Sequence, residues 1–258
     1  MSEDFSVPDY FNSNKPTTTN AYTIFPHFCS IPNHSPDLDF EFNFFYNRQQ
    51  NPSGDGRCDL ITMPLKGKTV LDLGCFEGGH TYQFEKKGAI CTGIEANTAS
   101  FLKCLINKNT LHMSSNFLLG DCMEFLQEAS IQQKKYDLIW CCGILYHMKN
   151  PLKMIELMST ITDTFYIWTL YVPEEEAEAW DPVNIIDQTA PNFSCKGYRY
   201  YYPQRYDREY AGSQTFCIRL TQSSIVTYAE KLGFGCDLMT DPNSEEVTPG
   251  RANFLFKK

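Results

Sequence analysis

The stretch VLDLGCFEGGHT, residues 70–81, sets the strongest limit on how this chain can fold. An apolar run passes directly into three closely spaced glycines, Gly74, Gly78 and Gly79, and then into a segment typical of a helix. Glycines at the end of a strand let the main chain approach a ligand where side chains would clash. The helix that follows presents free N–H groups and the positive end of its dipole there. We therefore expect a strand, a loop and a helix that bind a polar ligand at the carboxyl end of the strand.

The alternation of apolar runs and helical segments continues from Gly67 to Val172. The predicted strands comprise residues 69–75, 89–96, 116–121, 136–146 and 164–172. The predicted helices between them comprise residues 79–89, 98–109, 123–129 and 150–160. This order predicts an α/β fold with a Rossmann-like, doubly wound parallel sheet covered on both faces. Residues 236–241 and 251–258 are predicted to pair as an antiparallel hairpin, because the segment between them is too short for a helical crossover.

The spacing around the glycines argues against a dinucleotide ligand. Phe76 stands where the GxGxxG fingerprint has its second glycine. Phe76 and Glu77 are poor neighbours for a pyrophosphate and favour a ligand that is positively charged at this place. Glu95 ends the second predicted strand, where a carboxylate can accept hydrogen bonds from ribose hydroxyls. Asp121 ends the third strand and can accept from an exocyclic amine. An adenosine linked to a cationic amino acid fits this set better than NAD does.

Four ordered motifs between Gly67 and Val172 resemble those of class I S-adenosylmethionine-dependent methyltransferases. They are VLDLGCFEGGHT, GIEAN, LLGDC and CCGILYHMKNP. In more detail the segment is similar to bacterial methyltransferases of unassigned substrate, and LYH followed by proline also resembles wobble-uridine carboxymethyltransferases. The resemblance implies a seven-stranded sheet with an antiparallel last strand, and S-adenosylmethionine as the cofactor. The departure is Phe76, since the commoner motif has glycine there.

The resemblance also implies which residues bind the cofactor. The glycine loop would contact its methionine part, Glu95 its ribose and Asp121 its adenine amine, while Asp72 would orient the loop or reach the methionine ammonium through water. The complete predicted set is Asp72, Gly74, Cys75, Phe76, Glu77, Gly78, Glu95, Ala96, Asp121, Cys122, Cys142 and Gly143.

Tyr146 and His147 follow the fourth predicted strand, where an acceptor would approach the methyl group. Histidine titrates near neutrality, so His147 can take the proton of a hydroxyl whose oxygen attacks the methyl carbon. The alternative is that His147 caps the next helix and Tyr146 packs beneath the cofactor. The residues predicted to contact the acceptor are Tyr146, His147, Arg199 and Trp168, the first two of them catalytic.

The chain divides into an N-terminal extension, residues 1–65, and a methyltransferase domain, residues 66–258. Aromatic residues in the extension could close the site as a lid or pack on the core. Residues 173–215 break the alternating pattern and are predicted to form an insertion on the acceptor side. Within it Arg199 lies among tyrosines, in a flap for an anionic acceptor or an ordinary cover for a sheet edge.

The net charge of −9 argues against a nucleic-acid partner, because proteins that bind phosphate backbones usually carry a basic surplus. The 11 cysteines show no CxxC spacing and are predicted to be reduced thiols, and no histidine spacing indicates a metal. The acidic start lacks a signal pattern and no apolar stretch could span a membrane, so we expect a cytoplasmic protein.

The leading hypothesis is O-methylation of a small molecule. The alternatives are a tRNA-modifying methyltransferase and a non-catalytic protein that binds S-adenosylmethionine. The oligomeric state is not indicated.

Overall fold

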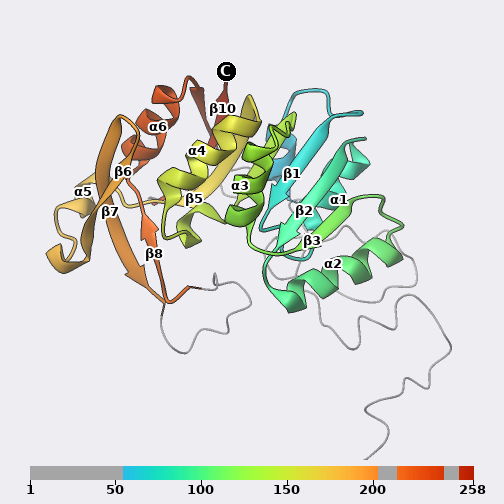
Figure 1. Ribbon diagram of the computed structural model, residues 1–258, viewed down its shortest axis with the longest axis horizontal. Helices are drawn as coiled ribbons and strands as arrows, with labels where there is room; N and C mark the ends of the chain where they lie inside the picture. Colours follow the sequence, from blue (N-terminus) through green and yellow to red (C-terminus); the bar gives the residue numbers. More distant parts are fainter. Residues whose placement is uncertain (1–54, 203–213, 241–249) are drawn as a thin grey trace, which may run out of the picture.

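A seven-stranded sheet forms the centre of the protein, whose computed structural model describes residues 55–202, 214–240 and 250–258 (Figure 1). The order across the sheet is β3-β2-β1-β4-β5-β10-β9. In that order the strands are Asn116–Leu119, Ile90–Glu95, Thr69–Leu73, Leu138–Cys142, Thr164–Leu170, Arg251–Lys257 and Gly235–Met239. Every neighbouring pair is parallel except those of β10, which runs antiparallel to both β5 and β9. The predicted α/β sheet with an antiparallel last strand is confirmed.

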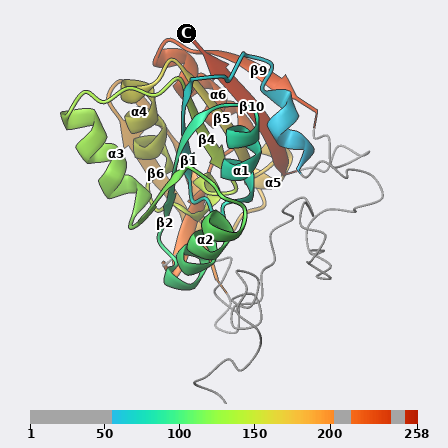
Figure 2. The same cartoon turned by 90° about the vertical axis from the view of Figure 1, so that its right-hand side faces the viewer.

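Helices cover both faces of this sheet, as Figure 2 shows for α1 on one side and α3 and α4 on the other. The helices are α1 (Gly79–Lys86), α2 (Thr98–Thr110), α3 (Cys122–Ile131), α4 (Pro151–Ile161) and α6 (Gln222–Lys231). Successive side chains of a strand point to opposite faces. In β1, accordingly, Leu71 and Leu73 join the core under α3, α4 and α6, while Val70 joins the core under α1.

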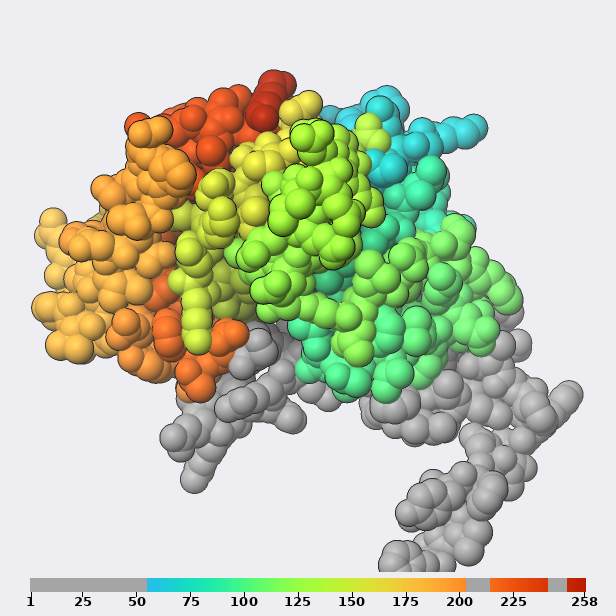
Figure 3. All heavy atoms as spheres, in the orientation of Figure 1, coloured from blue at the N-terminus to red at the C-terminus, as the bar shows by residue number. Residues whose placement is uncertain are grey.

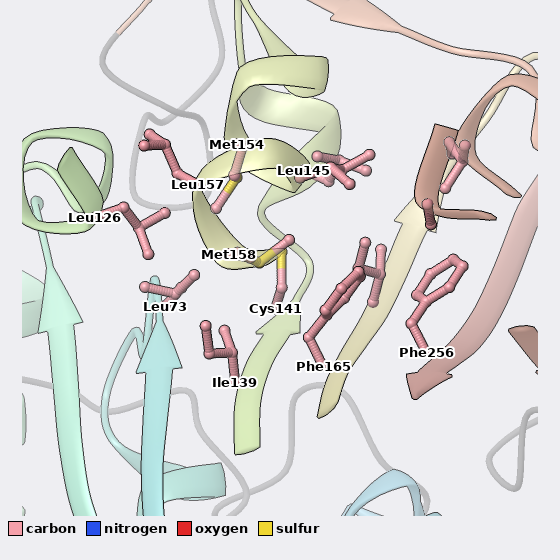
Figure 4. Close-up of a cluster of buried hydrophobic side chains, with 14 of the residues drawn as sticks. Leu73, Leu126, Ile139, Cys141, Leu145, Met154, Leu157, Met158, Phe165 and Phe256 are labelled. Atoms are coloured by element: carbon pink, nitrogen blue, oxygen red, sulfur yellow. The ribbon is translucent and has the colours of Figure 1, made fainter. Parts of the chain in front are cut away.

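The larger core explains why the strands are so apolar. Figure 4 shows Leu73, Ile139 and Cys141 of the sheet packed against Leu126 of α3 and Met158 of α4. These five side chains are almost wholly buried. Burial on both faces therefore holds β1 and β4 rigidly in the middle of the sheet. The strand order reverses between these two strands, and ligands of open α/β sheets bind at such a point, beyond the carboxyl ends.

The fourth strand ends earlier than the sequence predicts. It stops at Cys142, and Gly143 then turns the chain with φ +83°. Residues Leu145–His147 form a short 3₁₀ helix, η4, in place of the last residues of the predicted strand. The apolar run was misleading because Leu145 is buried from a helical turn and not from a strand. This turn positions Tyr146 and His147 beyond the carboxyl edge of the sheet.

The segment after β5 forms a second, antiparallel sheet, in the order β6-β7-β8. Its strands are Ile185–Ala190, Phe193–Tyr201 and Phe216–Arg219, and they follow the short helices α5 (Glu174–Ala177) and η5 (Pro182–Asn184). Figure 3 shows β6 and β7, in orange, at the end of the molecule beside α4. This sheet extends beyond the insertion predicted for residues 173–215, because its third strand, β8, lies after residue 215. Residues 1–54 of the extension predicted over residues 1–65, and residues 203–213 of the tyrosine-rich segment, lie outside the described residues.

Ten cysteines lie in the described residues and all are free thiols, as predicted. Within those same residues, no helix combines the length and the apolar character needed to cross a bilayer.

A short 3₁₀ helix, η3 (Gly56–Leu60), leads from the start of the described chain toward β1.

Candidate active site

The glycine loop after β1 has an unusual backbone. Gly74, Phe76 and Gly78 have φ values of +63°, +55° and +81°, in the left-handed region that favours glycine. A Cβ on Gly78 would lie 2.9 Å from the ring of Phe117, and one on Gly74 would lie 2.7 Å from Ile144. Packing against the Phe117 ring therefore favours glycine at position 78, whereas the end of the Ile144 side chain could move and it is the positive φ that favours glycine at position 74. The loop joins the carboxyl end of β1 to the start of α1, the strand–loop–helix order that the sequence predicts.

Glu95 at the end of β2 holds this loop in place. Its two carboxylate oxygens accept hydrogen bonds from the main-chain N–H of Phe76 (2.8 Å) and of Asn97 (2.7 Å). Burial raises the pKa of Glu95, while the main-chain donors act in the opposite direction. The carboxylate thus lies at the strand end with its orientation fixed. Each oxygen has a second lone pair with which it can accept from a ligand hydroxyl.

Asp121 lies next to Glu95 along the same edge of the sheet. It caps α3 by accepting from the N–H of Met123 (2.7 Å), and its side chain is exposed. The N–H of the preceding Gly120 donates to the carbonyl of Glu95 at 2.9 Å, which joins the ends of β2 and β3. Two carboxylates therefore lie side by side, as a ribose and an adenine amine require.

Glu77 has a partner inside the protein, which corrects part of the sequence interpretation. Its carboxylate lies 3.0 Å from the ammonium of Lys103 on α2, and the two side chains are only 0% and 4% exposed. Asn107 of the same helix donates to the main-chain carbonyl of Glu77 (2.7 Å). Because Lys103 neutralises Glu77, this carboxylate gives no reason to expect a positively charged ligand. Its role in the loop is to attach the turn to α2.

Asp72 ties β1 to α1 beneath the loop. Thr81 of α1 donates its hydroxyl to the carboxylate at 2.6 Å, and Asp72 is only 1% exposed. Burial raises the pKa of Asp72 to about 6, although His80 and Thr81 act to lower it. The position supports the predicted role of Asp72 in orienting the loop.

This pKa predicts how stability depends on pH. The folded-state pKa of Asp72 lies above its ordinary value, so the folded protein binds the proton more tightly than the unfolded chain does. The stability that Asp72 contributes is therefore fully present below about pH 4 and is lost as the pH rises through about 6. Relative to Asp72→Asn, the wild-type free energy of unfolding should fall by about 3 kcal/mol over this range. Urea denaturation at several pH values measures it, and parallel curves for the two proteins would contradict it.

Five residues meet beyond the end of β4, and we call them the His147 cluster: Tyr146 and His147 of η4, Tyr202 after β7, and Cys217 and Arg219 of β8. Nδ1 of His147 lies 2.5 Å from the Tyr202 hydroxyl, and that hydroxyl neighbours the Cys217 thiol closely enough for each to influence the pKa of the other. If the hydroxyl donates to the thiol, its oxygen accepts from Nδ1–H. The lone pair of His147 then lies on Nε2, as a general base requires.

The cluster keeps His147 and Tyr146 uncharged at neutral pH. Burial, and then the positive charge of Arg219, lower the pKa of His147 to about 4. Burial raises the pKa of Tyr146 to about 12. Trp168 of β5 packs edge-on against the Tyr146 ring, with 5.9 Å between the ring centres. His147 can therefore accept a proton and Tyr146 can donate a hydrogen bond.

Arg219, and not the predicted Arg199, lies on the face of the second sheet that bears the His147 cluster. Paired residues of antiparallel strands point to the same face, and Tyr200 pairs with Cys217 while Arg199 pairs with Ile218. Arg199 therefore points away from the His147 cluster and lies over Phe216. Arg219 lies over the ring of Tyr200 at 4.0 Å, on the face that carries Cys217. The feature of the sequence that could have indicated Arg219 is its charge within the otherwise apolar run FCIRL.

A buried arginine, Arg57, packs against Trp168. Arg57 of η3 packs 4.8 Å from the centre of the Trp168 ring and forms a bidentate ion pair with Asp55. The same carboxylate contacts Nε2 of His80 at 2.6 Å. Sequence reasoning missed Arg57 and Asp55 because they fall in the segment interpreted as an irregular leader, which carries no motif.

The remaining predicted cofactor residues all lie at this edge of the sheet. Cys75 and Cys122 have buried side chains, so only their main chains can face a ligand. Ala96 is exposed beside Glu95, and Cys142 and Gly143 follow the end of β4. The carboxyl ends of four adjacent strands thus bring the predicted cofactor residues together, and the His147 cluster lies beyond β4.

Comparison with known proteins agrees with this geometry. A family model described as a methyltransferase domain matches residues 64–192, half of the chain. The ubiquinone biosynthesis O-methyltransferase of Histophilus somni is 31% identical over 140 residues, covering 48% of this chain and 58% of that protein. The tRNA U34 carboxymethyltransferase of Campylobacter concisus is 28% identical over 125 residues, covering 46% of this chain and 41% of that protein. The chain matches about half the length of these curated relatives.

Solved structures share the fold at low sequence identity. The N-terminal domain of EvdMO1, solved with SAH bound, has a TM-score of 0.66 at 14% identity and covers 95% of this chain and 98% of that one. A protein from Pyrococcus horikoshii has a TM-score of 0.52 at 14% identity, with coverage of 92% and 98%. These matches extend beyond the family model to the second sheet and the terminal strands, because they cover nearly the whole chain.

Proposed function

This chain belongs to the methyltransferase-domain family, and from that premise we propose that it transfers a methyl group to the hydroxyl of a small molecule. The coarser part of this proposal, an S-adenosylmethionine-dependent methyltransferase, is supported by the family model and by a structural neighbour solved with SAH bound. The small-molecule acceptor and the oxygen atom are our proposal. The observation that carries it is the His147 cluster, in which an uncharged histidine lies beside the carboxyl edge of β4.

The residues at the sheet edge fit the cofactor. Glu95 and Asp121 offer carboxylate oxygens for a ribose and an adenine amine, and the loop of Gly74 offers main chain for the amino-acid part. Asp72 lies beneath this loop, at the end of β1, where it is hydrogen-bonded to Thr81. When bound, S-adenosylmethionine supplies a methyl group on a sulfonium centre.

The residues of this chain then align the acceptor and move its proton. Tyr146 and Trp168 provide flat apolar surfaces that position the acceptor and exclude water. Alignment of the reacting atoms at about 3–3.5 Å supplies a large part of the rate enhancement. Nε2 of His147 accepts the hydroxyl proton, while the Tyr202 hydroxyl holds the ring through Nδ1. The ten free thiols suit a reducing compartment, so a cytoplasmic location is part of the proposal.

Calorimetry and a transfer assay test the proposal. The purified protein should bind S-adenosylmethionine and its demethylated product, and should then methylate a member of a panel of hydroxylated small molecules. Binding with no transfer to any member, including bulk tRNA, would favour a non-catalytic protein. Absence of binding by both compounds, in a folded sample, would end the proposal.

A tRNA acceptor is the second candidate, because a tRNA U34 carboxymethyltransferase is among the relatives. The net charge of −9 disfavours it. If tRNA is the acceptor, its affinity should fall steeply with salt, since phosphate contacts release bound counterions. A small molecule that is methylated at similar rates in low and high salt would support the leading proposal.

Glu95→Gln should weaken cofactor binding by about 10–100-fold, equivalent to about 1.5–3 kcal/mol for a hydrogen bond to a charged group. An amide presents only one acceptor oxygen, so one of the bonds from Phe76 and Asn97 is lost and the loop is released. Titration calorimetry with the demethylated cofactor measures the change. Glu175→Gln, on the exposed helix α5, is the matched control. Equal affinities for all three proteins would remove Glu95 from the site.

A further inference from the structure

Arg219 is the cation of the His147 cluster, and it has no carboxylate partner among the described residues. Elsewhere in those residues the buried cations Arg57 and Lys103 are paired with Asp55 and Glu77. The Nε–H of Arg219 is itself buried with no hydrogen-bond acceptor. Buried polar groups in native structures are rarely left unpaired, so a donor of this kind calls for a missing partner.

The neighbours of Arg219 do not neutralise it. The titratable residues that neighbour Arg219 are Tyr146 and His147 on η4, Tyr202 just after β7, and Cys217 on β8. At neutral pH all four are uncharged, because burial disfavours the charged form of each. Since a guanidinium does not lose its proton in proteins, the His147 cluster carries a net positive charge. A negatively charged group is therefore attracted to the place where the acceptor approaches.

Trp168 adds an independent observation. Its indole Nε1–H is also buried without an acceptor, and its ring packs against Tyr146. Two unpaired donors, from β5 and from β8, thus neighbour the same tyrosine. An oxygen-rich group on the acceptor would satisfy donors of this kind.

Neither the neighbouring Tyr200 ring nor a comparison with Arg199 accounts for the unpaired Nε–H of Arg219. The ring of Tyr200 stacks on the Arg219 guanidinium at 4.0 Å, but an aromatic face does not accept the in-plane Nε–H. Arg199 also has a buried Nε–H without an acceptor, but one of its terminal nitrogens donates to the Tyr201 hydroxyl at 3.3 Å, on the opposite face of the sheet. Among the arginines that the structure describes, Arg219 alone combines a buried Nε–H that lacks an acceptor with a position in the His147 cluster.

We propose that Arg219 binds a carboxylate group of the methyl acceptor, which makes the acceptor a hydroxylated carboxylic acid. A carboxylate is planar and matches the fork of a guanidinium with two parallel hydrogen bonds. Its single negative charge equals the single unpaired positive charge of the cluster. This inference rests on the proposed function, since it names the chemical class of that acceptor.

The test uses the complete protein saturated with the demethylated cofactor and titrated with ¹³C-labelled acetate at constant ionic strength. The acetate signal should broaden saturably with wild-type protein. Arg219→Met should abolish the broadening or weaken the apparent affinity at least tenfold. The exposed Arg251→Met is the matched control and should behave as wild type. Saturable binding that is lost in Arg199→Met instead would overturn the assignment and restore the sequence-based one. Wild-type protein that does not bind acetate would also overturn it.

Two further titrations separate other anions. Inorganic phosphate that binds at Arg219 at least tenfold more tightly than acetate would overturn the carboxylate in favour of a phosphorylated acceptor. Bulk tRNA that competes with acetate at Arg219, with a steep salt dependence, would overturn it in favour of RNA. Calorimetry with the demethylated cofactor keeps the two failures apart. Cofactor binding without acetate binding ends only this inference, whereas absent cofactor binding ends the proposed function. Normal cofactor affinity in Arg219→Met shows that the variant is folded.

Discussion

Replacing Lys103 with methionine should lower the free energy of unfolding by about 3–5 kcal/mol, the usual effect of leaving one charge of a buried pair without its partner. Lys103 and Glu77 are 3.0 Å apart and nearly inaccessible to water, so the remaining carboxylate would stay buried without the cation that neutralises it. The double variant Lys103→Met with Glu77→Met should recover most of the loss, because no isolated charge remains. Urea denaturation followed by tryptophan fluorescence measures all three proteins.

An exposed ion pair provides the control for this prediction. Lys257 and Asp237 lie 3.1 Å apart with 50% and 64% of their side chains exposed, so Lys257→Met should change stability by less than about 1 kcal/mol. The opposite interpretation is that Glu77 faces the cofactor. In that case Lys103→Met would be nearly as stable as wild type, and Glu77→Gln would weaken cofactor binding as strongly as Glu95→Gln does.

The sequence could predict the cofactor side because each of its residues is tied to the end of an apolar strand. Glu95 and Asp121 lie where their strands end, and parallel strands bring their carboxyl ends to one edge. The partner of Glu77 could not be found in this way. Lys103 lies 26 positions further along the chain, and only the packing of α2 against the loop brings the two charges together.

The acceptor side was harder to predict because it depends on tertiary contacts of the second sheet. A shift of one residue along a strand reverses the face of a side chain. The face on which Arg199 lies could therefore not be predicted without knowledge of its register against β8. Tyr202 and Arg219 reach His147 from distant positions, and no local pattern marks the contact.

His147→Asn should reduce kcat by about 10²–10⁴-fold, the usual contribution of a general base. Affinity for the demethylated cofactor should stay within about twofold, because His147 belongs to the cluster beyond β4 and not to the cofactor edge, a difference of less than about 0.5 kcal/mol. Steady-state kinetics with the acceptor found in the panel, and calorimetry, measure the two quantities. The exposed His112→Asn is the matched control, at a position where asparagine tolerates the positive φ of +53°. Unchanged turnover in His147→Asn would remove the base assignment.

The pH dependence of the wild-type protein gives this prediction a second measurement. The base must be unprotonated, so kcat/KM should rise with pH through a pKa of about 4, which belongs to the free enzyme. Arg219 lowers that pKa, and a bound carboxylate would offset its charge. The pKa seen in kcat, which reports the complex with the acceptor, should therefore lie closer to the ordinary value of histidine. Arg219→Met should raise the pKa seen in kcat/KM, but only in part, because burial remains the larger cause.

Tyr202→Phe should lower kcat more than it changes KM, since it removes the hydrogen bond between the Tyr202 hydroxyl and the His147 ring. A positioning role predicts that split, whereas a purely structural role would change stability and cofactor affinity together.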